Sequence, residues 1–147
     1  MLSVTKIFYF EMAHAIHGYA GYCKNIHGHS YMLYVTITTQ INQAGYIPSP
    51  GMLIDFKELK KLVIESVINK LDHHLVLSSK FLEENSSLSF TNNLVIMDAE
   101  PTVENLLVLI KDILLNKFSP DINLTHLKMY ETKDSYAEWT NTKQVKL

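Results

Sequence analysis

The chain has a single cysteine, Cys23, among its 147 residues. It therefore cannot form a disulfide within itself, and its cysteine usage favours a reducing compartment. No apolar run approaches the roughly 20 residues that a membrane-spanning helix needs, and the first residues lack the charged start and apolar stretch of a signal peptide. These absences predict a cytoplasmic protein without membrane segments.

An excess of charge of one sign is also missing. The chain has 13 Lys and Arg residues against 15 Asp and Glu, which leaves a net charge of −2. This balance gives no reason to expect a nucleic-acid-binding surface. There is no internal repeat, low-complexity tract or domain linker. With 47% hydrophobic and 19% charged residues, residues 1–147 are expected to form one domain with a real core.

Alternation of apolar and polar residues predicts two strands early in the chain, over residues 3–14 and 27–40. A glycine-containing loop separates them. If the two strands pair as a long hairpin, His14 near the end of the first meets His27 and His29 at the start of the second. The hairpin would then bring three imidazoles together.

Beyond a turn region over residues 42–50, the spacing of apolar residues becomes helical. It predicts a first helix over residues 55–71, with Asp55 as N-cap and Glu58 three residues later, as in a capping box. A second helix is expected over residues 103–118, where apolar residues again recur at three- and four-residue intervals.

Shorter elements complete the pattern. The stretch over residues 75–93 is polar and rich in Ser and Asn, residues 94–97 and 136–139 are typical of short strands, and residues 125–132 are typical of a longer one. The order of elements is two strands, a helix, a short strand, a helix and two strands. This order is typical of the α+β class, with two helices packed on one face of an antiparallel sheet.

Three histidines carry the strongest functional signal. His27 and His29 are two residues apart on a strand, so their side chains point to the same face, and His14 lies on the expected partner strand. Three neutral imidazoles leave a fourth position on zinc open, as in catalytic rather than structural sites. Zinc is the favoured ion, and iron, nickel or copper would also suit imidazole. Packed or solvated histidines without a metal are the alternative.

Two further groups stand near the histidines in the sequence. Cys23 lies in a polar, loop-like stretch, and the residues alone leave open whether it is a metal ligand, a nucleophile, a general base or a packed residue. Asp72 and His73 follow the first helix. They either cap its C-terminus or form a pair in which the carboxylate orients a histidine for proton transfer. Adjacent side chains do not normally hydrogen-bond to each other.

Two residues are candidates for substrate contact. Glu131 lies on the inward face of an apolar strand, where an unpaired carboxylate is unfavourable. It either forms a salt bridge or accepts hydrogen bonds from a ligand with two adjacent N–H donors, such as the guanidine-like edge of a purine or pterin. Thr102 stands at the start of the second helix, where its simplest role is the N-cap.

Six short blocks of sequence, spread over nearly the whole chain, belong together. The blocks are Phe10-Glu11-Met12-Ala13-His14, Cys23-x-x-x-His27-Gly28-His29-Ser30-Tyr31, Gly51-Met52-Leu53-Ile54-Asp55-Phe56-x-x-Leu59-Lys60, Leu71-Asp72-His73-His74, Pro101-Thr102-Val103-Glu104-Asn105 and Glu131-Thr132. In this order they resemble the 6-pyruvoyl-tetrahydropterin synthase family. Each block is modest evidence, and six in order are highly specific.

The resemblance implies a tunnelling fold, in which each subunit contributes a four-stranded antiparallel sheet with two helices on one face. Three sheets join into a barrel, two trimers stack as a hexamer, and the active sites lie between subunits. The implied roles are zinc binding by His14, His27 and His29, general-base catalysis by the Cys23 thiolate, proton relay by Asp72 and His73 of a neighbouring subunit, and pterin contact by Glu131 and Thr102.

Members of this family catalyse different reactions. Some convert 7,8-dihydroneopterin triphosphate to 6-pyruvoyltetrahydropterin. Others, in queuosine biosynthesis, convert it to 6-carboxy-5,6,7,8-tetrahydropterin and release acetaldehyde and triphosphate. A third group supplies a folate precursor and carries glutamate in place of, or beside, the cysteine. Three residues separate Cys23 from His27, which resembles the bacterial 6-carboxy enzymes, and no glutamate adjoins the motif.

The resemblance therefore implies a zinc-dependent lyase that forms the 6-carboxy product. The alternatives are the 6-pyruvoyl product, a non-catalytic zinc-stabilised pterin-binding module, and a zinc hydrolase that would need Glu131 beside the metal. The segment between His74 and Pro101 is longer than the compact bacterial pattern. We expect it to form an extra surface hairpin or to reshape the substrate mouth.

Overall fold

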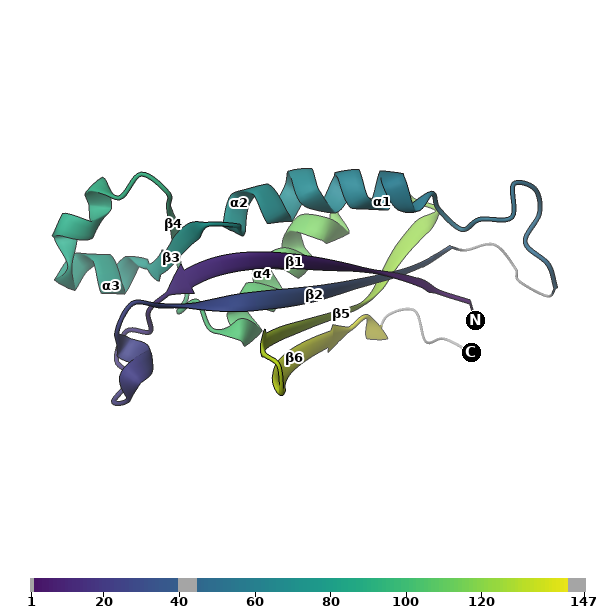
Figure 1. Cartoon of the computed structure of the whole chain (residues 1–147). Helices are drawn as coiled ribbons and strands as arrows, with labels where there is room; N and C mark the ends of the chain where they lie inside the picture. Colours follow the sequence, from purple (N-terminus) through teal and green to yellow (C-terminus); the bar gives the residue numbers. More distant parts are fainter. Residues whose placement is uncertain (1, 40–44, 143–147) are drawn as a thin grey trace.

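The computed structural model describes residues 2–39 and 45–142. These residues form a six-stranded sheet in the order β4-β3-β1-β2-β5-β6, with helices beside it (Figure 1). The strands are β1 (Val4–His14), β2 (His27–Thr39), β3 (His74–Ser78), β4 (Leu94–Met97), β5 (Ile122–Thr132) and β6 (Ser135–Thr140). The helical elements are η1 (Tyr22–Lys24), α1 (Phe56–Val63), η2 (Ile64–Ile68), α2 (Asn69–Leu71), α3 (Ser79–Glu84), η3 (Ser86–Phe90) and α4 (Val103–Leu115). No helix in the described part of the chain is long and apolar enough to cross a membrane.

The expected hairpin of β1 and β2 is confirmed. The two strands pair antiparallel from Val4 opposite Ile37 to His14 opposite His27. Their alternating apolar residues face the core, because successive side chains of a strand point to opposite faces. Residue 40 of the second predicted strand and residues 42–44 of the predicted turn lie outside the described residues.

The expectation of a four-stranded antiparallel sheet is wrong in its extent. β1, β2, β5 and β6 do pair antiparallel, but β3 and β4 extend the sheet beyond β1 as parallel strands. β3 lies in the stretch whose composition is polar overall. Its Val76 and Leu77 are fully buried, but so short an apolar run carries no usable periodicity.

The segment between β3 and β4 is not the expected hairpin. α3 and η3 form a small lobe at one end of the molecule (Figure 1). Phe81 of α3 packs with Leu75 and Leu77 of β3 and with Ala15, the first residue after β1, in a separate small core. The lobe therefore supports the beginning of the loop between β1 and β2.

The two predicted helices cover the same face of the sheet. Buried residues of α1 and α4, such as Leu59 and Ile110, share one core with the inward residues of the strands. The first helix runs to Leu71 as predicted, but it passes through the π-helical segment η2. α4 ends at Leu115 rather than Phe118, where the chain makes a tighter turn closed by the Lys117 N–H on the Leu114 carbonyl.

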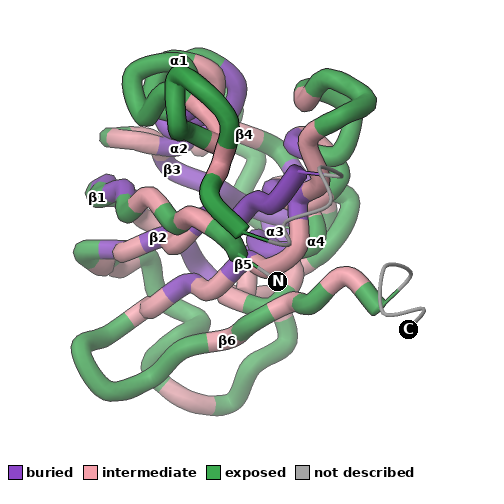
Figure 2. The backbone as a smooth tube through the Cα atoms, turned by 90° about the vertical axis from the view of Figure 1, so that its right-hand side faces the viewer, coloured by how far each residue is buried: buried purple, intermediate pink, exposed green. Residues whose placement is uncertain are grey.

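The opposite face of the sheet carries exposed apolar and aromatic side chains. Tyr9 is 70% exposed and Tyr136 is 48% exposed. Figure 2 shows the edge strand β6 with exposed and intermediate residues only, whereas β5 beside it contains buried residues. β5 begins at Ile122, earlier than the predicted residue 125. A register shift against β2 interrupts the alternation of its side chains, so the sequence pattern did not reveal the first part of the strand.

Candidate active site

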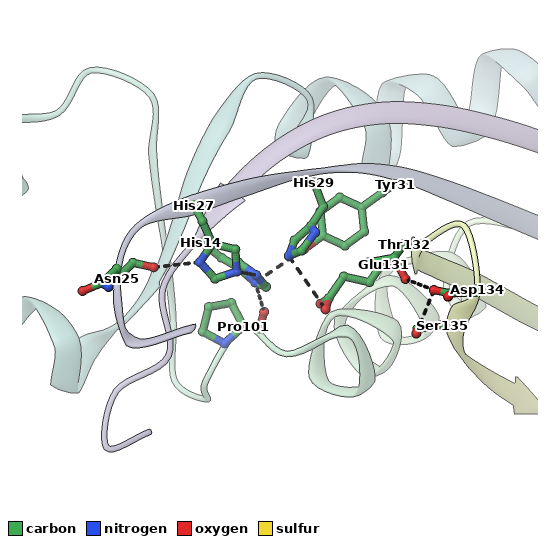
Figure 3. Close-up of polar contacts among 10 residues, drawn as sticks. All are labelled: His14, Asn25, His27, His29, Tyr31, Pro101, Glu131, Thr132, Asp134 and Ser135. Carbon is green, nitrogen blue, oxygen red and sulfur yellow. Dashed lines mark hydrogen bonds and ion pairs between the residues drawn. The ribbon is translucent and has the colours of Figure 1, made fainter. Parts of the chain in front are cut away.

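Three imidazoles meet where β1 ends and β2 begins (Figure 3). His14 Nε2 lies 3.0 Å from His27 Nε2, and the ligand nitrogens of these two residues and His29 all lie within 4.8 Å of one another. The hairpin register causes this, because it sets His14 opposite His27 and leaves His29 on the same face. Zinc–nitrogen bonds of about 2.0–2.1 Å put two tetrahedral nitrogens about 3.3 Å apart, so the spacing fits a shared ion.

Backbone carbonyls determine which nitrogens of two rings carry protons. His14 Nδ1 donates to the Pro101 carbonyl at 2.7 Å, and His27 Nδ1 donates to the Asn25 carbonyl at 2.7 Å. A carbonyl only accepts, so each Nε2 of the neutral rings carries a lone pair. Two lone pairs facing each other at 3.0 Å repel unless a cation lies between them. Ring orientation by a carbonyl is also typical of metal-bound histidine.

Burial favours the neutral form of His14 and His29. It lowers the pKa of His14 to about 4, against the opposing effect of the Pro101 carbonyl, and the neighbouring imidazoles lower that pKa further. Burial also raises the pKa of Tyr31, whose hydroxyl lies 3.4 Å from His14 Nδ1 and stays protonated. Metal ligation requires neutral imidazole, so this environment favours a ligand over a charged histidine.

His29 and Glu131 form the other side of the cluster. His29 Nε2 is buried without a hydrogen-bond partner, and Glu131 Oε1 is 3.8 Å away, which is too long for a hydrogen bond. Burial lowers the pKa of His29, and Glu131 raises it by less. The pairing of β5 with β6 shifts register between Tyr130 and Thr132, and such irregularities re-aim side chains. An orphaned ring nitrogen beside two others fits a divalent metal such as zinc.

A cavity of about 240 Å³ beside the cluster joins four of the predicted site residues. His14, Cys23, Thr102 and Glu131 all line it. Cys23 lies in the short helix η1 with its side chain exposed. The Ile16 N–H donates to the Cys23 carbonyl at 2.8 Å, which closes the loop around η1. Cys23 therefore lines the same cavity as one of the candidate metal ligands.

Asp72 and His73 lie elsewhere in the chain. His73 lines a second cavity of about 390 Å³ together with His29, and this cavity shares no lining residue with the one that Cys23 lines. Contrary to the expectation for adjacent residues, Asp72 Oδ1 is 2.9 Å from His73 Nδ1. The backbone of His73 has a positive φ of 58°, which reverses the chain and brings the His73 ring back toward the Asp72 carboxylate. The same carboxylate accepts the Glu11 N–H at 2.9 Å.

Thr102 is the N-cap of α4, as its position predicts. Its Oγ1 accepts the Asn105 N–H at 3.3 Å. We expect Thr102→Ala to lower the free energy of unfolding by about 1 kcal/mol, because that donor loses its partner. Urea denaturation measures the change. Thr102→Ser keeps the hydroxyl and should unfold close to wild type, so an equal loss in both variants would contradict the capping role.

Sequence reasoning missed several groups of the site. The carbonyls of Pro101 and Asn25 orient two histidines, and Glu100 anchors the loop of Cys23 to the loop before α4 through the His17 N–H. Every residue has a carbonyl, so residue type gives no signal for such a role. Glu100 has no recognisable motif either, because its partner lies 83 positions away.

The fold and the cluster define an α+β protein with three histidines that could hold a metal ion, beside a cavity. A family model described as 6-pyruvoyl tetrahydropterin synthase matches residues 3–142, and the chain belongs to this family.

Named relatives match nearly the full chain. The 6-carboxy-5,6,7,8-tetrahydropterin synthase of Rickettsia typhi is 31% identical over 94% of this chain and 99% of its own. The enzyme of that name from Haemophilus influenzae is 26% identical over 95% and 99%. The structure of Caenorhabditis elegans 6-pyruvoyl tetrahydropterin synthase superposes with a TM-score of 0.65 at 21% identity, covering 96% of each chain. This last similarity concerns the fold.

Proposed function

We propose that the chain is a zinc-dependent lyase of queuosine biosynthesis. It converts 7,8-dihydroneopterin triphosphate to 6-carboxy-5,6,7,8-tetrahydropterin and releases acetaldehyde and triphosphate. The names of the Rickettsia and Haemophilus relatives favour this product. The observation that carries the proposal is that the lone cysteine and a histidine of the metal cluster line one cavity. We place this activity in the cytoplasm.

Each group has one task in this proposal. His14, His27 and His29 would hold a zinc ion, which would supply Lewis acidity at the substrate side chain. Cys23, as a thiolate, removes a proton from that side chain. The Glu131 carboxylate accepts two N–H groups of the pterin, and Thr102 gives a second contact beside it. Holding the ring this way brings the side chain to the metal site, and orientation of this kind contributes about 7–11 kcal/mol in favourable cases.

The proton relay of Asp72 and His73 comes from a neighbouring copy of the chain in this proposal. Within one chain His73 and Cys23 line separate cavities, and the His73 side chain is 78% exposed. The uncovered sheet face with exposed Tyr9 and Tyr136 suits burial against other copies. We propose a homohexamer built as two stacked trimers.

Two other functions use the same groups. The 6-pyruvoyl product would need the same cluster and cysteine, and only the product separates it from the 6-carboxy reaction. A zinc hydrolase needs a carboxylate beside the metal, and the 3.8 Å between Glu131 and His29 favours that reading. In the hydrolase Cys23 would be dispensable, which a substitution tests.

Product analysis tests the proposal directly. The zinc-loaded protein should convert 7,8-dihydroneopterin triphosphate to the 6-carboxy pterin and equal amounts of acetaldehyde, measured by mass spectrometry and an aldehyde assay. Treatment with a chelator should stop both products, and added zinc should restore them, because the histidines alone supply no Lewis acid. A 6-pyruvoyl product without acetaldehyde would select the first alternative. No pterin product at all would leave the non-catalytic zinc-stabilised module.

A further inference from the structure

Glu100 joins two loops that line the candidate active site. Its Oε1 accepts the backbone N–H of His17 at 2.6 Å, at the start of the loop that carries Cys23. Its own carbonyl accepts the Thr102 N–H at 2.8 Å and the side-chain amide of Asn105 at 2.9 Å. One residue therefore links the loop between β1 and β2 to the first turn of α4.

Both linked segments supply walls of the cavity. Tyr19 and Cys23 line it from the loop side, and Thr102 lines it from the helix side. Pro101, next to Glu100, holds the ring of His14 through its carbonyl. The position of the thiol relative to the histidines thus depends on how the loop is held against the segment before α4.

The bond from Glu100 is a strong candidate for that hold. It joins a side-chain oxygen to a backbone N–H at 2.6 Å in a half-buried place, where a donor left without a partner is costly. The His17 side chain makes a second link, 3.1 Å from Glu84 of α3, but the two side chains are 28% and 69% exposed. Exposed ion pairs of this kind contribute little.

We propose that Glu100 is a positioning residue that holds the Cys23 loop in its place beside the histidine cluster. The Glu100 side chain is long enough to reach the His17 N–H, and its oxygen accepts that hydrogen bond. Its charge is secondary. The catalytic consequence of this proposal depends on the proposed lyase function. Its structural consequence, the ordering of the Cys23 loop, is independent of that function.

Three variants separate the effects of the length of the Glu100 side chain, its charge, and the His17 side chain. Glu100→Asp keeps the charge but is one methylene shorter, so it loses contact with the His17 N–H. Glu100→Gln keeps the reach and an acceptor oxygen. His17→Ala keeps the N–H and removes only the imidazole and its contact with Glu84.

Hydrogen–deuterium exchange of the loop, residues 15–26, is the first readout. We expect exchange about tenfold faster in Glu100→Asp, as for loss of one hydrogen bond, and close to wild type in Glu100→Gln and His17→Ala. Bound zinc per chain should stay unchanged in all three. On the zinc-loaded protein, kcat should fall in Glu100→Asp with KM little changed, because the proposed pterin anchor is untouched.

Several results would overturn the proposal. Unchanged loop exchange in Glu100→Asp would show that the reach of this side chain does not hold the loop, and faster exchange confined to Glu100→Gln would show that the charge matters instead. Circular dichroism checks folding of each variant. In wild type, a His17 amide that exchanges as fast as an unstructured chain would refute the proposal, even if a variant fails to fold. If the wild type does not turn over the pterin substrate, the proposed function fails while the exchange result still stands.

Discussion

Replacement of Cys23 with alanine is expected to lower the rate of product formation by about 10²–10⁴-fold, the usual contribution of a general base. Zinc content and pterin affinity should stay close to wild type, because the metal ligands and Glu131 are other residues. The thiol lines the cavity beside His14. Single-turnover product formation, metal analysis and pterin fluorescence titration measure the three quantities.

The exposed position of Cys23 makes this a clean substitution. The structure gives it a hydrogen bond through its carbonyl, from the Ile16 N–H, and alanine keeps that carbonyl. Tyr22→Ala is a matched control, because Tyr22 lies in the same short helix and is 92% exposed. It should retain activity. A fully active Cys23→Ala enzyme would remove the base assignment and favour the hydrolase with Glu131.

Substitution of His29 with alanine is expected to weaken zinc binding by more than about 100-fold, since loss of a group that merely supports a ligand already costs 10–100-fold. Lyase activity should disappear with the metal. The physical reason is that only two imidazoles then remain in the cluster. Competition with a chromogenic chelator measures the affinity, and inductively coupled plasma mass spectrometry measures the zinc per chain.

A thermal unfolding series sharpens this test. In the wild type, zinc should raise the midpoint of unfolding, because a ligand that binds only the folded state stabilises it. His29→Ala should lose that rise. The metal-free variant should be about as stable as the metal-free wild type, because the deleted Nε2 has no hydrogen bond to lose. His126→Ala is the control, since His126 lies on β5 and contacts Glu138 at 3.1 Å. Unchanged zinc affinity in His29→Ala would refute the metal site.

The histidine cluster is the part of the candidate site that could be predicted from the sequence. Alternation along two strands placed His27 and His29 on one face, and the short loop allowed His14 to meet them. The structure confirms that meeting at 3.0 Å between His14 and His27. Side-chain direction in a strand depends only on residue parity, and parity is a local property that can be read directly from the sequence.

Other features depended on contacts between distant segments. β3 is a short apolar run at the start of a stretch that is polar overall, and it became a strand because β1 and β4 offered hydrogen-bonding edges on both sides. Asp72 and His73 met because the backbone of His73 takes a positive φ. Neither feature leaves a periodic pattern in the residues themselves.

The sequence by itself therefore determined the hairpin, the two helices, the three candidate ligands and the family. Each of these follows from local periodicity or from ordered motifs. Tertiary structure alone decided the two parallel strands, the carbonyl of Pro101 on His14, and the bond of Glu100 to the loop of Cys23. Each of these contacts involves a backbone group, and the contacts of Pro101 and Glu100 join positions 87 and 83 residues apart. A backbone group is the same at every position, so no residue type reveals such a contact.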